Sequence, residues 1–274
     1  MPWPSRLKSE MTSRGDRSVE SKPAQRRPLI ERLRPEYAAG GYSRYDGTSE
    51  FFVRINTLLR PEMSILDFGA GRGRGLAINR SSPFRYSLLC MKGKVARVVG
   101  VDVDPAVLQN RGLDEAHVVG PNEPLPFAPN TFDLVICDHV LEHIADPAFF
   151  AAEMERLIRP GGWLCARTPH RWGYIGIATN LIPNRWHKAV LRKVQEERKE
   201  EDVFPTLYRL NTYRALRRHF PLAKWGHHSY GWSSEPGYHG ENLILWRLIE
   251  LYNNLMPPNL AAKIHVFLQR RPQN

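Results

Sequence analysis

Short apolar runs alternate with amphipathic segments along the middle of the chain. From residue 64 onward, buried strands are predicted at 65–67, 96–102, 117–119, 132–137 and 163–168. These runs are continuously apolar, which is typical of parallel strands that are buried on both faces. Because helix-like segments separate them, the pattern predicts an α/β fold in which helices cover both faces of a parallel sheet.

The clearest helix is predicted over residues 146–158. Asp146 is its expected N-cap, Pro147 its first residue and Pro160-Gly-Gly162 its stop signal. Outside the alternating region, the sequence predicts a helix over 49–60, a helix over 211–220, a strand within 223–230, a helix over 241–255 and a last strand over 264–269.

A glycine-rich turn follows the first strand, in the segment Ser64-Ile-Leu-Asp-Phe-Gly-Ala-Gly-Arg-Gly-Arg-Gly75. Glycine at a turn lets the backbone pass close to a ligand. The dinucleotide fingerprint G-x-G-x-x-G fails in every frame, because its third glycine would fall on Arg74, Leu76 or Ile78. Asp67 stands two residues before the first glycine. A carboxylate at that position suits an ammonium or sulfonium group better than a pyrophosphate.

A second strand also ends in an acid, within Val98-Val-Gly-Val-Asp-Val-Asp-Pro105. Asp102 is placed to accept hydrogen bonds from the ribose hydroxyls of an adenosine, whereas Asp104 is the expected cap of a helix that begins at Pro105. Asp102 lies 27 positions past Gly75, compared with about 20 in an ordinary adenosine-binding unit. We therefore interpret residues 79–93 as an insertion beside the glycine turn.

A third motif runs over residues 125–144, from Leu-Pro-Phe through Phe-Asp-Leu-Val to Leu-Glu-His-Ile. Together with the Asp67 and Asp102 motifs, and followed by Arg159-Pro-Gly-Gly162, it resembles the class I S-adenosylmethionine-dependent methyltransferases of the LEHI type. The resemblance covers about residues 63–170. It implies S-adenosylmethionine as the cofactor. It also implies a doubly wound, mostly parallel seven-stranded sheet of the Rossmann-like methyltransferase fold, with an antiparallel last strand.

The resemblance also implies which residues bind the cofactor. In the family, an acid shortly before Leu-Pro-Phe contacts the adenine amino group. Pro121 stands roughly at that position here, so Glu123 or Asn122 is the expected substitute. The fourth strand ends at Asp138, where the family places its methionine-binding and substrate-facing residues. The cofactor-binding residues implied in this way are Asp67, Gly69, Ala70, Gly71, Asp102, Val103, Glu123 and Asp138.

Transfer of a methyl group from a sulfonium needs mainly in-line positioning, and it needs a base only if the acceptor must lose a proton. His139 after the fourth strand and His170 after the fifth are the candidate catalytic bases, since histidine titrates near neutral pH. For each, a polar loop residue is the alternative. Glu142-His143 is interpreted as structural. Amino-group methyltransferases carry an Asn/Asp-Pro-Pro-aromatic loop where this chain has Cys137-Asp-His-Val140, which disfavours methylation of an exocyclic base amine.

Composition and charge place the chain among globular proteins. It has 274 residues, 42% hydrophobic and 24% charged, and a net charge of +11. Residues 1–35 hold nine Lys/Arg and four Asp/Glu, or +5 of that charge, so we expect a disordered basic arm followed by one methyltransferase domain over 36–274. The three cysteines have no metal-ligand spacing, so no metal is expected. With no secretory signal or membrane span in sight, the prediction is a cytoplasmic protein.

Residues 171–209 are interpreted as a lid or acceptor-site insertion. The mixed aromatic and basic residues of 171–194 suit a peripheral contact with the inner face of a membrane, or a cover over a lipid-linked or sugar acceptor; a lid packed on the sheet edge is the alternative. The sequence thus predicts methyl transfer, at oxygen, to a small-molecule or carrier-linked (glycan or lipid) acceptor, without a nucleic-acid partner. Two alternatives stay open. One is an RNA methyltransferase with a phosphate-binding arm, and the other is a non-catalytic binding protein that retains the fold.

Overall fold

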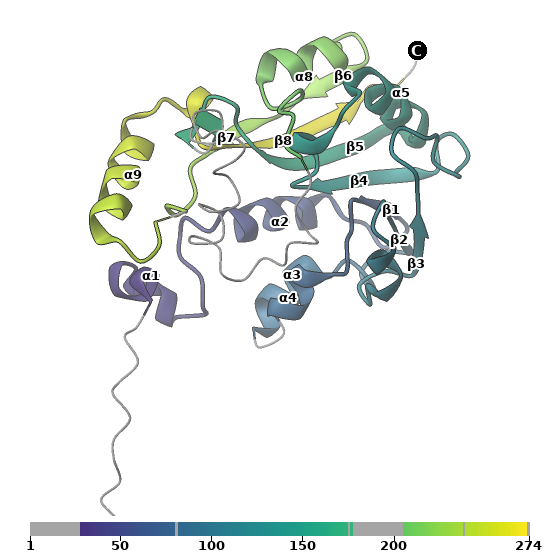
Figure 1. The fold of residues 1–274 in the computed structure, drawn as a ribbon. Coiled ribbons are helices and arrows are strands. Elements are labelled where there is room, and N and C mark those ends of the chain that lie inside the picture. The colour runs from purple at the N-terminus through teal and green to yellow at the C-terminus, as the bar shows by residue number, and fades with distance from the viewer. Residues whose placement is uncertain (1–27, 80–81, 175, 178–204, 238, 273–274) are drawn as a thin grey trace, which may run out of the picture.

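The computed structural model describes residues 28–79, 82–174, 176–177, 205–237 and 239–272. Its centre is a twisted sheet with the strand order β3-β2-β1-β4-β5-β8-β6, in which β7 also pairs with β8 (Figure 1). The strands are β1 (Ser64–Phe68), β2 (Arg97–Asp102), β3 (Glu115–Val118), β4 (Phe132–Asp138), β5 (Ile158–Pro169), β6 (Trp225–His227), β7 (Tyr230–Trp232) and β8 (Lys263–Arg270).

The direction of the strands matches the doubly wound fold. β1 pairs with β2 and with β4, β2 with β3, and β4 with β5, all in parallel, whereas β8 runs antiparallel to β5. The predicted doubly wound, mostly parallel sheet is confirmed, but the described residues form eight strands instead of seven. The outermost position beside β8 is filled by two short strands, since β6 pairs with one end of β8 and β7 with the other.

Helices cover both faces of this sheet. α5 and α8 lie on one face, and α2 and α4 lie on the other (Figure 1). Side chains alternate between the two faces along β4, so that Val135 and Cys137 join the first core while Leu134 and Ile136 join the second. The described helices are α1 (Leu29–Leu33), η1 (Pro35–Ala38), α2 (Gly47–Leu58), α3 (Arg74–Ile78), α4 (Pro83–Leu89), η3 (Pro105–Gln109), η4 (Leu141–His143), α5 (Pro147–Leu157), α8 (Tyr213–His219), α9 (Leu243–Leu255) and η6 (Pro258–Leu260).

Side-chain caps set the starts of the main helices. The Asp146 carboxylate accepts the backbone N–H groups of Ala148 and Phe149 at 3.0 Å each, as the sequence predicted. The predicted stop of this helix is placed too late. α5 ends at Leu157 and β5 begins at the next residue, so Pro160-Gly-Gly162 lies inside the strand, where β4 and β5 change register.

Part of the predicted basic arm is ordered. Within residues 1–35, α1 contributes a fully buried Leu29, and Arg34 forms ion pairs with Glu235 (3.2 Å) and Glu250 (2.6 Å). The boundary predicted at residue 35 is therefore too late by at least one helix. Residues 1–27 lie outside the described part of the chain.

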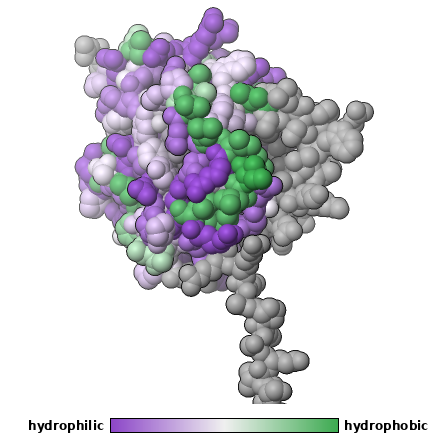
Figure 2. All heavy atoms as spheres, turned by 90° about the vertical axis from the view of Figure 1, so that its left-hand side faces the viewer, coloured by the Kyte–Doolittle hydropathy of each residue, from purple (hydrophilic) through white to green (hydrophobic). Residues whose placement is uncertain are grey.

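α9 presents an apolar surface to solvent. Figure 2 faces the side of the molecule on which α9 lies in Figure 1, and it shows apolar side chains gathered near the centre of the view. Only Trp246 of this helix is buried. The large apolar side chains that α9 leaves exposed are Leu243, Ile244, Leu245, Leu248, Leu251 and Leu255. Within the described ranges, no helix is both long and apolar enough to cross a membrane.

The two-sided core predicts where a truncation is costly. Leu216 of α8 is fully buried, so Leu216→Ala should lower the free energy of unfolding by about 2–5 kcal/mol. Leu222, which is 56% exposed, is the matched control, and its alanine variant should stay within about 0.5 kcal/mol of the parent protein. Urea unfolding followed by circular dichroism measures both. Equal losses in the two variants would contradict the assignment of α8 to the core.

Candidate functional site

The turn after β1 requires glycine for its backbone conformation. Gly69, Gly71 and Gly73 adopt positive φ angles of 78°, 49° and 73°, a region that side chains disfavour. Space is also short, because a Cβ on Gly69 would lie 2.4 Å from a methyl group of Val140. The glycines therefore fold the chain into a tight turn that leaves its backbone open to the neighbouring cavity.

Two polar side chains from β2 and the segment after it hold this turn in place. Asp102 accepts the Gly71 N–H through Oδ2 at 2.8 Å and the Asp104 N–H through Oδ1 at 2.9 Å. Asn110 donates from Nδ2 to the carbonyl oxygens of Ala70 (3.1 Å) and Gly71 (3.2 Å). Asn110 is a functional residue that sequence reasoning missed, since no spacing marked it. Asp102 keeps further lone pairs for a ligand hydroxyl.

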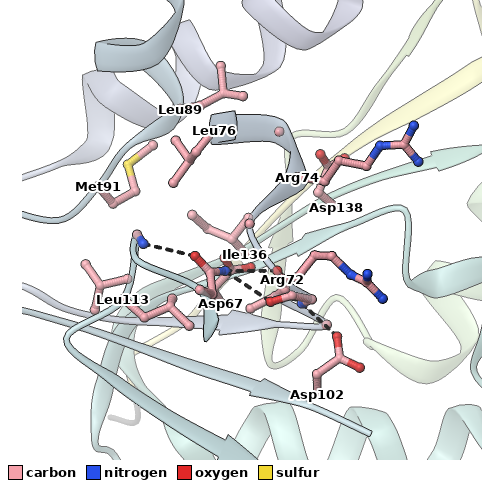
Figure 3. Close-up of a pocket in the computed structure, with 18 of the residues that line it drawn as sticks. Asp67, Arg72, Arg74, Leu76, Leu89, Met91, Asp102, Leu113, Ile136 and Asp138 are labelled. Carbon is pink, nitrogen blue, oxygen red and sulfur yellow. Dashed lines mark hydrogen bonds between the residues drawn. The ribbon is translucent and has the colours of Figure 1, made fainter. Parts of the chain in front are cut away.

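A cavity of about 350 Å³ opens at this turn, over the carboxyl ends of β1, β2 and β4. In Figure 3 the apolar side chains of Leu76, Leu89 and Met91 gather on one side of it, away from Asp102. Leu89 and Met91 belong to the predicted insertion 79–93, of which residues 80–81 lie outside the described chain. The insertion thus supplies part of the cavity wall, a role that the sequence did not reveal.

Most of the predicted cofactor residues line this cavity. The structure brings together Asp67, Gly69, Ala70, Gly71, Asp102 and Asp138. Two others lie outside its wall. Val103 is 41% exposed, and Glu123 is exposed in the loop after β3, where its carboxyl group lies against Gly120.

The carboxylate of Asp67 lacks a compensating positive charge among the residues that the structure describes. Burial, together with the negative charges of Asp138 and Asp102, raises the pKa of Asp67 to about 7. The ionised form is therefore disfavoured, and a cation bound beside the carboxylate would reverse that effect. A positively charged ligand is the chemistry that this wall favours.

Asp138, by contrast, is compensated. Arg167 stands directly opposite it on β5 and donates two hydrogen bonds, from Nε to Oδ1 and from Nη2 to Oδ2, both at 2.8 Å. Burial alone would raise the pKa of Asp138, but the Arg167 guanidinium outweighs burial and lowers it to about 2. Arg167 also donates to the hydroxyl of Thr48 in α2. Sequence reasoning missed Arg167 because it lies inside an apolar strand.

His139 lies just past β4 with a positive φ of 59°. Its Nδ1 is 3.1 Å from Oε1 of Glu142, whose other carboxylate oxygen accepts the Thr168 hydroxyl at 2.7 Å. Glu142 is 4% exposed, and its carbonyl oxygen also accepts two backbone N–H groups, from Leu207 and Tyr208. Glu142 thus fixes one nitrogen of the His139 ring and ties the end of β5 to the chain after residue 204.

His170 is in a different environment. It is 3% exposed, its ring packs against Tyr213 at 6.0 Å, and burial lowers its pKa. Its Nδ1 has no hydrogen-bond partner in the described part of the chain. Neither His139 nor His170 is among the residues that line the 350 Å³ cavity.

The comparisons with known proteins point to methyltransferases. Residues 66–166 match the family model described as a methyltransferase domain. One solved structure, a complex between the Haloferax volcanii Trm112 methyltransferase activator and a methyltransferase, superposes with a TM-score of 0.52 at 16% identity. That match covers 88% of this chain and 98% of the other, and it supports the fold alone.

Curated relatives share the same region. The Thiobacillus denitrificans ubiquinone biosynthesis O-methyltransferase is 33% identical over 89 residues, covering 30% of this chain and 38% of the relative. Its Rhizobium johnstonii counterpart is 29% identical over 136 residues, covering 46% and 50%. The chain spans half or less of the length of these relatives. Over residues 66–166 the chain therefore resembles the class I S-adenosylmethionine-dependent methyltransferases, whose cofactor is S-adenosylmethionine.

The raised pKa of Asp67 predicts a pH-dependent stability in the absence of cofactor. Because the folded-state pKa of about 7 lies above the unfolded value of 3.8, the folded protein binds the extra proton. Its stability then falls as pH rises between about 4 and 7 and is level above that range. Asp67→Asn should remove this fall, so that the variant gains on the parent protein as pH rises. Urea unfolding at a series of pH values measures the difference.

Asp138→Asn is the control for that experiment. Its carboxylate is stabilised in the folded state, with a pKa of about 2, so its loss should lower stability above about pH 4. Because the Asp138 charge also contributes to the raised pKa of Asp67, the fall in stability between about pH 4 and 7 should become smaller in this variant but not disappear. A parent protein and an Asp67→Asn variant with parallel pH profiles would contradict the assigned environment of Asp67.

Proposed function

We propose that the protein transfers the methyl group of S-adenosylmethionine to an oxygen atom of a small-molecule or carrier-linked acceptor. The observation that carries the proposal is the convergence of Asp67, Asp102 and an open glycine backbone on one cavity. Relatives named as ubiquinone biosynthesis O-methyltransferases support oxygen as the methylated atom. Within this proposal, we further expect the acceptor to be a glycan or a molecule linked to a lipid.

The chain's own residues have distinct parts in holding the cofactor. Asp102 accepts ribose hydroxyls, Asp67 offers its negative charge to the cationic methionine end, and the backbone of residues 69–71 passes alongside. Val103 and Glu123 stay predicted contacts for the adenine end. S-adenosylmethionine supplies an activated methyl group on a sulfonium, which leaves as a neutral thioether. The protein therefore has mainly to bind, orient and exclude water.

A hydroxyl acceptor must also lose its proton. His139 is the better placed of the two candidate bases, because Glu142 fixes its Nδ1 while a third of its side chain stays exposed. His170 is almost completely buried, and burial lowers its pKa. A neutral histidine that packs in the core is therefore the better description of His170 than a general base. We keep both as proposed catalytic residues, with His139 preferred.

Few described residues bear on the surroundings of the acceptor. Most of the predicted lid, residues 178–204, lies outside the described chain. A peripheral membrane contact is supported by the exposed apolar surface of α9. This helix contacts the described start of the predicted lid, because the Tyr252 hydroxyl donates to the Trp172 carbonyl oxygen at 3.5 Å. A location at the inner face of the membrane fits such a contact.

Cofactor binding is the first test. Calorimetric titration with S-adenosylmethionine should show binding by the parent protein and a loss of about 10- to 100-fold in affinity for Asp102→Asn, because a charge-assisted hydrogen bond is removed. Glu62→Gln, a change at an exposed residue outside the cavity, is the control and should bind like the parent. Absence of binding by the parent protein would leave only the non-catalytic alternative.

The acceptor class is tested by transfer of a labelled methyl group from the cofactor into a cell extract that is then separated into lipid, glycan, RNA, protein and small-molecule fractions. We expect label in the small-molecule, lipid or glycan fraction with the parent protein and none with Asp102→Asn at the same cofactor concentration. Label in RNA would favour the RNA methyltransferase, for which the basic arm offers phosphate contacts.

The same assay tests the base. His139→Gln should slow transfer by about 100-fold or more while cofactor affinity stays unchanged, because general-base catalysis contributes on that scale. A variant that transfers as fast as the parent protein would exclude His139 from this role.

A further inference from the structure

A second cavity, of about 210 Å³, lies at the same edge of the sheet as the cofactor cavity. The stretch from Ser43 to Thr48 forms one wall, Ser234 and Glu235 form another, and Lys263, the first residue of β8, forms a third. Lys263 pairs in register with Pro169, the last residue of β5. The second cavity is therefore next to the carboxyl end of β5.

A buried arginine lies between the two cavities. Arg167 pairs with Asp138, which lines the cofactor cavity, and donates to Thr48, which lines the second cavity. Because one guanidinium contacts a wall residue of each, the two cavities are neighbours.

The charged residues that line the second cavity differ in whether they have a partner. The Asp46 carboxylate accepts the N–H groups of Thr48 (2.9 Å) and Ser49 (2.8 Å) and pairs with Arg85. Glu235 pairs with Arg34 at 3.2 Å and accepts the Ser43 hydroxyl. Each acid in the wall thus already has a cationic or donor partner.

Lys263 is the exception. Its ammonium has no hydrogen-bond acceptor and no carboxylate within 4.0 Å among the described residues. Burial lowers the pKa of Lys263 to about 8, and the charge of Arg167 acts in the same direction. Asp138, Asp46 and Glu142 act against the shift without cancelling it. At neutral pH the cavity therefore contains a partly buried cation that is not paired with a carboxylate among the described residues.

We propose that this second cavity is the acceptor pocket and that Lys263 binds the reacting oxygen of an acidic phenol as its phenolate. The inference rests on the proposed methyl transfer to oxygen. A phenolate supplies the missing anion, and it is the nucleophilic form of the acceptor. The ring of Tyr45 in the wall offers an aromatic partner for the phenol ring. The ammonium holds the phenolate in place and lowers the acceptor's pKa, so that the phenol proton is released to solvent. The phenolate oxygen then forms a bond to the methyl carbon as the carbon–sulfur bond of the sulfonium breaks and a neutral thioether leaves.

The probe for this pocket is 4-nitrophenol, because its phenolate is coloured and its neutral form is not. Titrated against the full-length protein in the presence of S-adenosylhomocysteine, it should bind with its pKa lowered by about one unit or more. Lys263→Met should lose that shift and bind about 10-fold or more weakly, whereas Lys263→Arg should retain part of both. Lys224→Met, at an exposed lysine paired with Glu155, is the control and should match the parent protein.

The outcomes are separable from those of the proposed function. No shift with the parent protein, or an equal shift with Lys263→Met, would overturn the assignment. Displacement of 4-nitrophenol by an equal concentration of benzoate would identify the pocket's ligand as a carboxylate and overturn the phenolate. Cofactor titration of Lys263→Met verifies that the variant is folded. If the parent protein bound 4-nitrophenol as expected but not the cofactor, the methyltransferase proposal alone would fail.

Discussion

The buried guanidinium of Arg167 links the two cavities at the carboxyl edge of the sheet. It is 5% exposed, forms a two-point ion pair with Asp138 and reaches Thr48 at the start of α2. An uncompensated arginine in this position would cost several kcal/mol, and so would an uncompensated aspartate. Their pairing keeps Asp138 ionised, whereas Asp67, one strand away, is left to hold its proton up to about pH 7. Because Asp138 is already paired with Arg167, Asp67 is the acid whose ionised form a cationic ligand would stabilise.

The same ion pair also ties the helix layer to the sheet. Thr48 lies in the first turn of α2, so the Arg167 contact fixes the end of that helix against the carboxyl ends of β4 and β5. The guanidinium lies over the ring of Phe51 at 5.7 Å, which adds a cation–π contact from the same helix. Electrostatics at the site and packing of α2 are thus not independent, and a change in one alters the other.

Hydrophobic pattern predicted the strands of this fold well because a doubly wound sheet buries them on both faces. The acids at strand ends, Asp67, Asp102 and Asp138, were found for a related reason: an apolar run that stops at a charge marks where a buried strand leaves the core. The hydrophobic pattern does not reveal which residues lie opposite each other on neighbouring strands. Arg167 acquires its role only because register sets it opposite Asp138, and that register is fixed by the whole sheet.

Other parts of the site depend on packing over long sequence distances. Asn110 holds the glycine turn from 39 and 40 residues away, and a single asparagine in a loop carries no periodic signal. Leu89 and Met91 close the cavity from a segment that the sequence marked only as an insertion. Lys263 is one of many lysines until β8 folds beside β5. In each case the sequence gives the residue type, but only the folded structure shows which residues it contacts.

The division of the outermost strand into β6 and β7 bears on how the molecule behaves in a crowded solution. Each of these strands is three residues long, and β3 at the opposite margin has four. Growth of a sheet by addition of a strand from another copy needs a longer row of free backbone donors and acceptors than either margin presents in the described chain. A sheet bounded in this way resists joining with its own copies, even though its interior is made of the apolar segments that aggregate most readily once they are exposed.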